Sequence, residues 1–506
     1  MRRAAALLAA LALALSLAAC TDRPNPASSA IPTPAVASPK PPAGLARYYD
    51  QKLDWHSCGD NACAWLRVPL DYAHPRGRSI KIGVLKVAAT DQAHRLGALV
   101  VNPGGPGASG MNFALYGAGG YFRSALTSRY DIVGFDPRGV GQSAPIDCGD
   151  TAQTDAMVNS DPAPRTASQW KQAVKTARAY MERCVQLSGA VAKHVSTVEA
   201  ARDMDILRAA LGDSRLHYFG ASYGTFLGAT YASLFPKRVG RMVLDGALDP
   251  SLSTTQMAVQ QAQGMQVALD AYVADCVAGG SCPLGSTTKA ATARVGALLD
   301  EVRKHPLPTG TSRPLTAGLM TLGVWQPLYV KSDWPNLTAA FAEVIDQRSG
   351  SKFLAMADTY IGRGSQGYSD NSLAAQTAVN CLDEGDPMTW QQARTMTKRF
   401  LKASPTFGRA FAPMPASCEF YPVHHHQAPR AIRAKGAPPI VVIGTTRDPA
   451  TPLRWAKALA GELDSGVLVT RDGDGHTAYS QGNQCINDTV ENYLVKGTVP
   501  RNGLAC

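Results

Sequence analysis

The sequence has few charged residues and lacks any stretch in which basic and aromatic residues alternate. Charged residues make up 18% of its 506 positions, and 50 Lys and Arg stand against 39 Asp and Glu. Because nucleic-acid-binding proteins cluster basic residues on one surface, this pattern argues against nucleic acid as a partner. No internal repeat is visible. The 45% apolar content, with 46 Gly and 34 Pro, excludes disorder and collagen-like order for most of the chain and predicts a globular protein of one or two domains.

The amino-terminal apolar run is too short to span a membrane comfortably. Residues 4–19 are all apolar or small and follow Arg2 and Arg3, a pattern typical of a signal peptide, here residues 1–19. Residues 17–20 resemble a bacterial lipobox, which implies acylation of Cys20 and lipid anchoring to the outer face of the cytoplasmic membrane, in the cell envelope. The alternative is a plain secretory signal followed by an incidental cysteine.

The segment after Cys20 lacks any apolar periodicity. Residues 21–42 consist mostly of Pro, Ala, Ser and Thr, a composition that cannot bury a core. We therefore expect residues 20–45 to form the lipidated cysteine and a disordered tether.

Besides Cys20 the chain contains ten cysteines, an even number that predicts disulfides in an exported protein. The sequence alone does not fix their connectivity. A metal site at Cys276 and Cys282 would need a second pair of ligands, which the sequence lacks, so no metal is expected. Pairing of neighbours along the chain suggests Cys58–Cys63, Cys148–Cys184, Cys276–Cys282, Cys381–Cys418 and Cys485–Cys506.

Short runs rich in Val, Ile and Leu alternate with stretches of helical spacing, which predicts an α/β fold around a mostly parallel sheet. The runs are apolar on both faces, as expected for parallel strands covered by helices. Two of the helices are expected at 170–185 and 197–211, and mixed acidic and apolar positions in the second predict one solvent-facing side. The expected strands are 98–101, 131–135, 216–219, 242–244, 440–443 and 467–469.

The strand pattern stops between the fourth and fifth of these runs, where Ala-rich and Gln-rich helical stretches replace it. We interpret residues 251–415 as a helical lid inserted into a sheet domain. The first part of that domain is expected at 46–250 and the second at 416–506.

The motif Gly-Ala-Ser-Tyr-Gly at 220–224 lies between an expected strand and a run compatible with a helix, 225–234. This is the context of a nucleophile elbow, in which glycines permit a strained turn and close packing of the flanking chain. The turn would expose Ser222 at the carboxyl end of the sheet. The alternative is a glycine-rich turn without a catalytic role.

A serine nucleophile needs a base, and His476 is the best candidate for it. It lies in a glycine-rich loop directly after the last expected strand, so its ring can reach over the sheet edge. His217 falls inside a strand and is expected to pack in the core. The run 424–426 of three histidines is interpreted as a solvated loop, with metal binding as the alternative.

Asp448 is the candidate for the acid that orients the base, because it follows the expected strand 440–443 through a short turn stiffened by Pro449. Asp472 and Asp474 share the loop of His476 and are expected to shape that loop. The resulting order of Ser222, Asp448 and His476 along the chain is the order found in α/β-hydrolases.

The turn at 102–107 follows the first expected strand and has the sequence Asn-Pro-Gly-Gly-Pro-Gly. Prolines have no amide hydrogen, so only Gly104 and Gly105 can offer an oxyanion donor ahead of Gly107. We choose Gly105, with the amide of Tyr223 as the second donor; the alternative is that the glycines only permit close packing. The segment 134–143 is interpreted as structural support in which Asp136 and Arg138 pair.

Together, the turn 103–107, the segment 134–143, the Ser222 elbow, the Asp448 segment and the His476 loop resemble the proline iminopeptidase and tripeptidyl aminopeptidase branch of the α/β-hydrolases. The similarity extends from about residue 48 to residue 506 and is strongest to secreted actinobacterial members with a TAP-like carboxyl-terminal part. It implies an α/β-hydrolase fold and a serine hydrolase that needs no cofactor. Such an enzyme would release tripeptides or single residues from free amino termini through an acyl-enzyme. A carboxylesterase or lipase with the same triad, and an inactive peptide-binding lipoprotein, are the alternatives.

The segment 380–384 bears on the choice between peptides and esters. In similar exopeptidases this region carries acidic groups for the ammonium of the substrate, which implies Asp383, and after it Glu384, as binding residues. A solvated helix end beside a disulfide is the alternative.

Overall fold

The centre of the computed structural model, which describes residues 41–383, 388–421, 423 and 430–506, is a ten-stranded sheet. Its strand order is β1-β2-β3-β5-β4-β6-β7-β10-β11-β12. The edge strands β1 (His56–Cys58), β2 (Asn61–Pro69) and β3 (Ser79–Val87) are antiparallel, and β3 also pairs antiparallel with β5. The remaining strands run parallel and include all six apolar runs predicted from the sequence: β4 (Gly97–Asn102), β5 (Tyr130–Phe135), β6 (Leu216–Ala221), β7 (Val239–Asp245), β10 (Ile440–Arg447), β11 (Gly466–Asp474) and the short β12 (Leu504–Ala505).

Helices cover both faces of this sheet, so the predicted α/β architecture is confirmed. Successive strand residues point to opposite faces: Val100 and Val442 belong to one apolar cluster, whereas Val101 and Val441 belong to the other. The first face is covered by α6 (Thr197–Ala210), α7 (Tyr223–Leu234) and α16 (Leu453–Glu462), and the second by α2 (Gly110–Tyr116), α3 (Ser124–Thr127), α17 (Gln484–Glu491) and η8 (Asn492–Lys496).

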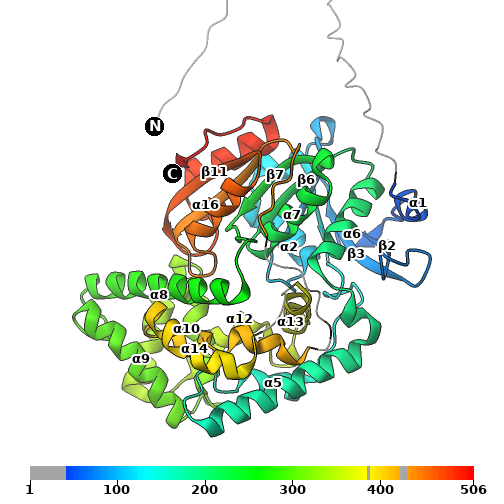
Figure 1. Ribbon diagram of the computed structural model, residues 1–506. Coiled ribbons are helices and arrows are strands. Elements are labelled where there is room, and N and C mark those ends of the chain that lie inside the picture. The colour runs from blue at the N-terminus through cyan, green and yellow to red at the C-terminus, as the bar shows by residue number, and fades with distance from the viewer. Residues whose placement is uncertain (1–40, 384–387, 422, 424–429) are drawn as a thin grey trace, which may run out of the picture. The chain divides into compact units, whose positions relative to one another are not determined.

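The chain between β7 and β10 forms helices that lie below the sheet in Figure 1. Most of them pack around a separate apolar cluster that includes Leu298, Phe341 and Phe400, all fully buried. No helix in the described part of the chain combines the length and the apolar character that crossing a membrane requires. The helices of this cap are α8 (Thr254–Ala278), α9 (Thr288–Lys304), α10 (Ala317–Leu328), α11 (Trp334–Ala342), α12 (Ser351–Ile361), α14 (Trp390–Ala403) and α15 (Gly408–Phe411).

Two parts of the chain depart from the simple picture of one inserted lid. Helices α4 (Thr151–Val158) and α5 (Ala167–Ser188) precede the nucleophile strand in sequence, yet Val158 joins the cap cluster and Trp170 contacts the ring of Trp390. Conversely, α13 (Ser372–Asp383) lies within the insertion but packs with the sheet cluster. The cap is therefore assembled from two separate segments, and α13 lies between the cap and the sheet (Figure 1).

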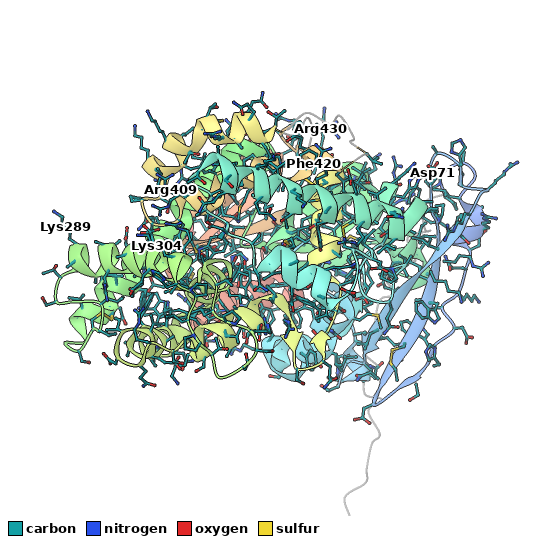
Figure 2. All side chains as sticks on the ribbon, turned by 90° about the horizontal axis from the view of Figure 1, so that it is seen from below. Asp71, Lys289, Lys304, Arg409, Phe420 and Arg430 are labelled. Carbon is teal, nitrogen blue, oxygen red and sulfur yellow. A yellow bond between two sulfur atoms is a disulfide. The ribbon has the colours of Figure 1, made fainter. Side chains whose placement is uncertain are left out.

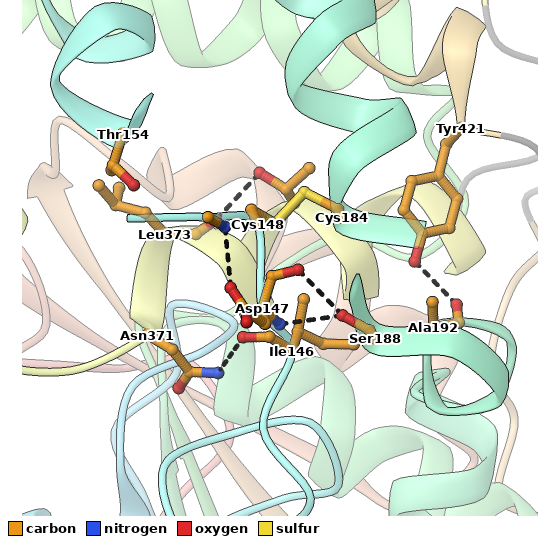
Figure 3. Close-up of a disulfide and its surroundings, with 12 residues drawn as sticks. Ile146, Asp147, Cys148, Thr154, Cys184, Ser188, Ala192, Asn371, Leu373 and Tyr421 are labelled. Atoms are coloured by element: carbon orange, nitrogen blue, oxygen red, sulfur yellow. Dashed lines mark hydrogen bonds between the residues drawn. A yellow bond between two sulfur atoms is a disulfide. The ribbon is translucent and has the colours of Figure 1, made fainter. Parts of the chain in front are cut away.

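The ten cysteines of the described chain pair in the five combinations expected from the sequence. Figure 3 shows Cys148–Cys184, which links the chain after β5 to α5. Around it, the amide of Asp147 donates to Ser188 Oγ (2.9 Å), and Asn371 Nδ2 donates to the carbonyl of Ile146 (2.9 Å). The disulfide thus lies where the chain after β5, α5 and the residue before α13 meet.

Helix α6 does not have the solvent-facing side predicted for it, because Asp203 and Asp205 are both buried. A distant arginine satisfies Asp203, and an arginine one turn along the same helix bonds Asp205. The guanidinium of Arg138 donates from Nε (2.7 Å) and Nη2 (2.8 Å) to Asp203, and Arg208 Nε donates to Asp205 (2.9 Å). A buried carboxylate is tolerated when it is paired and hydrogen-bonded in this way.

The expected pair between Asp136 and Arg138 is wrong for the same reason, since Arg138 is committed to Asp203. The Asp136 carboxylate instead accepts the hydroxyl of Ser109 (2.5 Å) and the amide of Gln142 (3.0 Å). It therefore joins the start of α2 to the loop after β5 and still supports the turns beside the nucleophile.

We predict that Arg138→Met lowers the free energy of unfolding by about 3 to 5 kcal/mol, because Asp203 would remain buried without its counter-charge. The matched control is Arg433→Met, which breaks the ion pair with Asp464 at an arginine side chain that is 76% exposed; a loss of about 1 kcal/mol or less is expected there. Urea denaturation of both variants with their disulfides intact tests the difference. Equal losses would contradict the importance assigned to the buried pair.

Candidate active site

Ser222 occupies a strained turn between the end of β6 and the start of α7. Its backbone has φ 55° and ψ −127°, a conformation unusual for a residue with a side chain. Its amide donates to the carbonyl of Asp245 at the end of β7 (2.8 Å). A Cβ on Gly220 would lie 2.4 Å from the carbonyl oxygen of Gly224, so only glycine allows strand and helix to approach this closely. The geometry is that of a nucleophile elbow.

His476 lies in the loop after β11, and its ring is held by Asp448. Nδ1 lies 2.9 Å from both carboxylate oxygens of Asp448. The carboxylate is fully buried and also accepts the amides of Ala450 (2.9 Å), Thr451 (2.8 Å) and Thr477 (3.1 Å). These bonds fix the acid and direct the other ring nitrogen of His476, Nε2, away from it.

The electrostatic surroundings of His476 favour its protonated form. Burial alone would lower the pKa of the imidazole, but the charge of Asp448, the hydrogen bond to it and the charge of Asp245 raise the pKa above its usual value. A base of raised pKa accepts a proton more readily during a reaction. It also loses its basic form as pH falls, so activity that depends on neutral His476 is lost on the acid side.

The ring of His476 lies beside the end of β7, the strand next to the one that leads to Ser222. Its Cε1 atom, adjacent to Nε2, would be 3.3 Å from a Cβ on Gly246. Gly246 directly follows Asp245, whose carbonyl accepts the amide of Ser222. His476 therefore contacts Asp448 directly and lies beside the residue that follows Asp245, whose carbonyl accepts the amide of Ser222.

The turn after β4 packs directly against the elbow. A Cβ on Gly104 would lie 2.8 Å from the amide nitrogen of Tyr223 and 3.0 Å from the Cβ of Ser222. The amide of Gly104 already donates to Asn102 Oδ1 (2.9 Å). The amides of Gly105 and Tyr223, in contrast, donate to no other group of the described chain, which leaves both available as oxyanion donors.

The rival candidates occupy other environments. Asp472 and Asp474 accept hydrogen bonds from Arg447, Asp472 at 2.9 Å, and so shape the loop of His476 as expected. His217 accepts the amide of Arg241 (3.0 Å), and burial lowers its pKa to about 4, as expected of a core histidine. The histidine run 424–426 lies outside the described residues.

Asp383, at the end of α13, lies in the wall of a mainly apolar cavity of about 170 Å³ beside the elbow helix. Its Oδ1 accepts the amide of Thr197 (2.8 Å) and its Oδ2 accepts the hydroxyl of Thr197, which also bonds the hydroxyl of Tyr223. Burial raises the pKa of Asp383 to about 7, against the opposing effect of the Thr197 hydrogen bonds. Glu384 and Cys20 lie outside the described residues.

Sequence reasoning missed several residues that hold the site. Tyr329 follows α10 of the cap, and its carbonyl accepts the amide of His476 (2.8 Å). The centres of the Tyr329 and His476 rings are 5.2 Å apart. Lys331 of the cap bonds Asp474 in the same loop (2.9 Å). Thr451 donates to Asp448 (3.0 Å). Only Thr451 has a local sequence signal, three residues after the acid; the cap residues have none.

Comparison with known proteins adds independent information. Residues 404–506 match the family described as TAP-like protein. The chain is 36% identical over 492 residues to serine protease Hip1 of Mycobacterium tuberculosis, covering 92% of this chain and 93% of that protein.

Two further relatives have similar coverage. Carboxylesterase B of Mycobacterium tuberculosis is 35% identical over 498 residues, covering 94% of this chain and 95% of that protein. A tripeptidyl aminopeptidase of Streptomyces lividans is 33% identical over 475 residues, covering 90% of this chain and 86% of that protein.

Proposed function

The chain belongs to the α/β-hydrolase family of the tripeptidyl aminopeptidases with a TAP-like carboxyl-terminal part, and on this premise we propose that it is an exopeptidase that releases tripeptides or single residues from free amino termini. Family membership makes it a serine hydrolase. The observation that carries the assignment of the triad is the contact of His476 Nδ1 with Asp448 beside the strained Ser222 elbow. Ser222 is the nucleophile, His476 the base and Asp448 the residue that orients it.

In the acylation step, Ser222 Oγ attacks the carbonyl carbon of the scissile bond while His476 Nε2 takes the hydroxyl proton. Asp448 keeps the Nδ1 proton directed toward its carboxylate and stabilises the imidazolium. The amides of Gly105 and Tyr223 donate to the oxyanion. Loss of one such donor costs about 2.7 to 4 kcal/mol of transition-state stabilisation.

Collapse of the tetrahedral intermediate breaks the bond to the leaving group, which takes its proton from His476 and departs as a free amine. Water then attacks the acyl-enzyme, His476 accepts one of its protons, and the acid leaves as Ser222 regains its hydrogen. Each group returns to its starting state, so these residues complete the cycle without a further reactant.

Asp383 is proposed to bind the ammonium of the substrate. Asp383 lines a mainly apolar cavity that Tyr223, Asp249 and Arg430 also border, and a negative charge there favours a positively charged amino terminus over an acylated one. An ion pair with Asp383 would limit how many residues lie between the amino terminus and Ser222, which is the property of an exopeptidase.

A carboxylesterase is the second candidate, supported by the 35% identical relative named carboxylesterase B. Ester and amide hydrolysis use the same nucleophile, base and oxyanion donors, and they differ in the leaving group that must be protonated. The distinction therefore depends on the substrate-binding groups rather than on the triad.

We predict that kcat/KM is highest for tripeptide anilides with a free amino terminus, lower for aminoacyl anilides and lowest for acetylated tripeptides. A panel that adds nitrophenyl esters separates the two candidate activities. Ser222→Ala should abolish turnover and labelling by a fluorophosphonate probe, leaving at most a residual rate on the order of 10³–10⁴ above water. A higher kcat/KM for simple esters than for every free peptide would favour the esterase, and failure of wild-type Ser222 to react with the probe would overturn both.

For Asp383→Asn we predict a higher KM for free peptides and little change for nitrophenyl esters. The same reasoning gives a pH dependence in the wild type: as pH falls through about 7, Asp383 gains a proton, the anion disappears, and KM for free peptides rises. Asp249→Asn is the matched control, because Asp249 borders the same cavity and, like Asp383, accepts hydrogen bonds from a neighbouring hydroxyl residue, here Ser251 (2.6 Å); it should leave KM for free peptides unchanged. Equal effects of Asp383→Asn on peptides and esters would remove the ammonium site.

We further propose that acylated Cys20 anchors the protein to the outer face of the cytoplasmic membrane. The support is the apolar run of residues 4–19 together with the lipobox-like residues 17–20, which end at Cys20. We predict that Cys20→Ser converts a membrane-associated protein into one recovered from the medium or left unprocessed, and that radiolabelled palmitate enters the wild type only. Incorporation of label into the serine variant would contradict acylation at Cys20.

A further inference from the structure

Asp245 lies at the end of β7, between the strand that leads to the nucleophile and the strand that leads to the acid. In register it pairs with Ala221 of β6 on one side and Ile443 of β10 on the other. Its carbonyl accepts the amide of Ser222 (2.8 Å). Its side chain is fully buried, so the carboxyl group must find its partners inside the protein.

Those partners are the backbone of the histidine loop. The amide of Ala478 lies 3.0 Å from both carboxyl oxygens of Asp245, and the amide of Tyr479 donates to Oδ2 (2.8 Å). Both amides follow Thr477, which has φ 67°, and precede Ser480, which has φ 63°. Residues with side chains hold such backbone conformations only when surrounding contacts impose them.

The loop of His476 is therefore held from two sides. The carboxylate of Asp448 accepts hydrogen bonds from Nδ1 of His476 and from the amide of Thr477 (3.1 Å). Asp245 accepts the next two amides. One side chain thus links the backbone of the nucleophile elbow to the backbone that carries the base, and the proposed triad leaves this carboxyl group without a role.

Four titratable groups on separate elements interact with Asp245. His476 and Asp448 interact with it from the two catalytic loops, Arg471 from β11 and Tyr121 from η2 (Gly117–Tyr121). Burial raises the pKa of Asp245 to about 6, against the lowering effects of its amide bonds and of His476. Above that pH the group is an anion, and its charge in turn raises the pKa of His476.

We propose that Asp245 is a positioning residue of the proposed triad: its carboxylate fixes the loop that carries His476 relative to Ser222 and stabilises the imidazolium formed when Ser222 is acylated. This inference rests on the proposed function only in that Ser222 and His476 react together. It does not depend on whether the substrate is a peptide or an ester.

The test measures the rate of fluorophosphonate labelling of Ser222 between pH 5 and 9 in the full chain and in Asp245→Asn. The amide of Asn is uncharged and turns one donor toward the loop amides. We expect the plateau rate to fall about 10- to 100-fold. On the acid side, the pH at which the labelling rate reaches half its plateau should be roughly 0.5 to 1 pH unit lower in the variant, because loss of the anion lowers the pKa of His476.

Asp213→Asn is the matched control. Asp213 also accepts a backbone amide, that of Ala98 (3.2 Å), and burial also raises its pKa, but it precedes β6 at the opposite end of the strands. Asp213→Asn should leave unchanged both the plateau rate of labelling and the pH of half-maximal labelling. With peptide substrates, Asp245→Asn should lower kcat and leave KM unchanged.

Unchanged labelling in Asp245→Asn would overturn the proposal. So would a lower rate with an unchanged pH of half-maximal labelling, since that result indicates a merely structural role. If the variant does not fold, hydrogen exchange in the wild type decides: exchange at Ala478 and Tyr479, corrected for intrinsic pH dependence, should accelerate below about pH 6 as Asp245 is protonated. If the amides of Ala478 and Tyr479 stay equally protected from exchange above and below about pH 6, the proposal is also overturned. Absence of labelling in the wild type would instead refute the triad itself.

Discussion

The register of four neighbouring parallel strands, β4, β6, β7 and β10, determines where the proposed nucleophile, acid and oxyanion turn lie. Asn102 of β4 is level with Gly220 of β6, and Asp245 of β7 is level with both Ala221 and Ile443. Because parallel strands end at one edge, the turns that follow them project from the same side of the sheet. The turn at 102–107, Ser222, Asp245 and Asp448 therefore all lie at or just beyond this edge. A slip of one residue in β7 would face its side chains to the opposite side and separate the elbow from the histidine loop.

The cap completes this site as well as covering it. Tyr329 accepts the backbone amide of His476 and places its ring against the imidazole, while Lys331 pairs with Asp474 in the same loop. On the other side of the elbow, Asp383 of α13 bonds Thr197 at the start of α6, and Thr197 bonds Tyr223. The cap therefore shares hydrogen bonds with the loop of the proposed base, whereas α13 bonds the helix starts beside Tyr223, so a displacement of the cap would change the position of His476.

The parts that were predictable from sequence are those in which local chemistry decides. The elbow at Ser222 and the turn at Gly104 and Gly105 depend on glycine and proline at fixed places in a turn, and the parallel strands depend on apolar residues on both faces. The parts that were not predictable depend on distant partners. Nothing near Asp205 indicates that Tyr49 and Arg238 will surround it, so its buried carboxylate looked like part of a solvent-facing side. For the same reason, Tyr329 could not be assigned to the site.

The disulfides and the triad stabilise different parts of the molecule. Cys58–Cys63 and Cys276–Cys282 close loops with separations of only 5 and 6 residues, whereas Cys148–Cys184 and Cys381–Cys418 span 36 and 37. In the chain-entropy account, loops of the longer class contribute about 3 to 4 kcal/mol each. Cys148–Cys184 ends on α5 of the cap and Cys381–Cys418 on α13, which lies between cap and sheet. Neither bridge joins the strands that lead to Ser222, Asp448 and His476. Reactive geometry therefore depends on strand register and buried hydrogen bonds, whereas the covalent links limit how far the cap-bearing segments can move from the sheet.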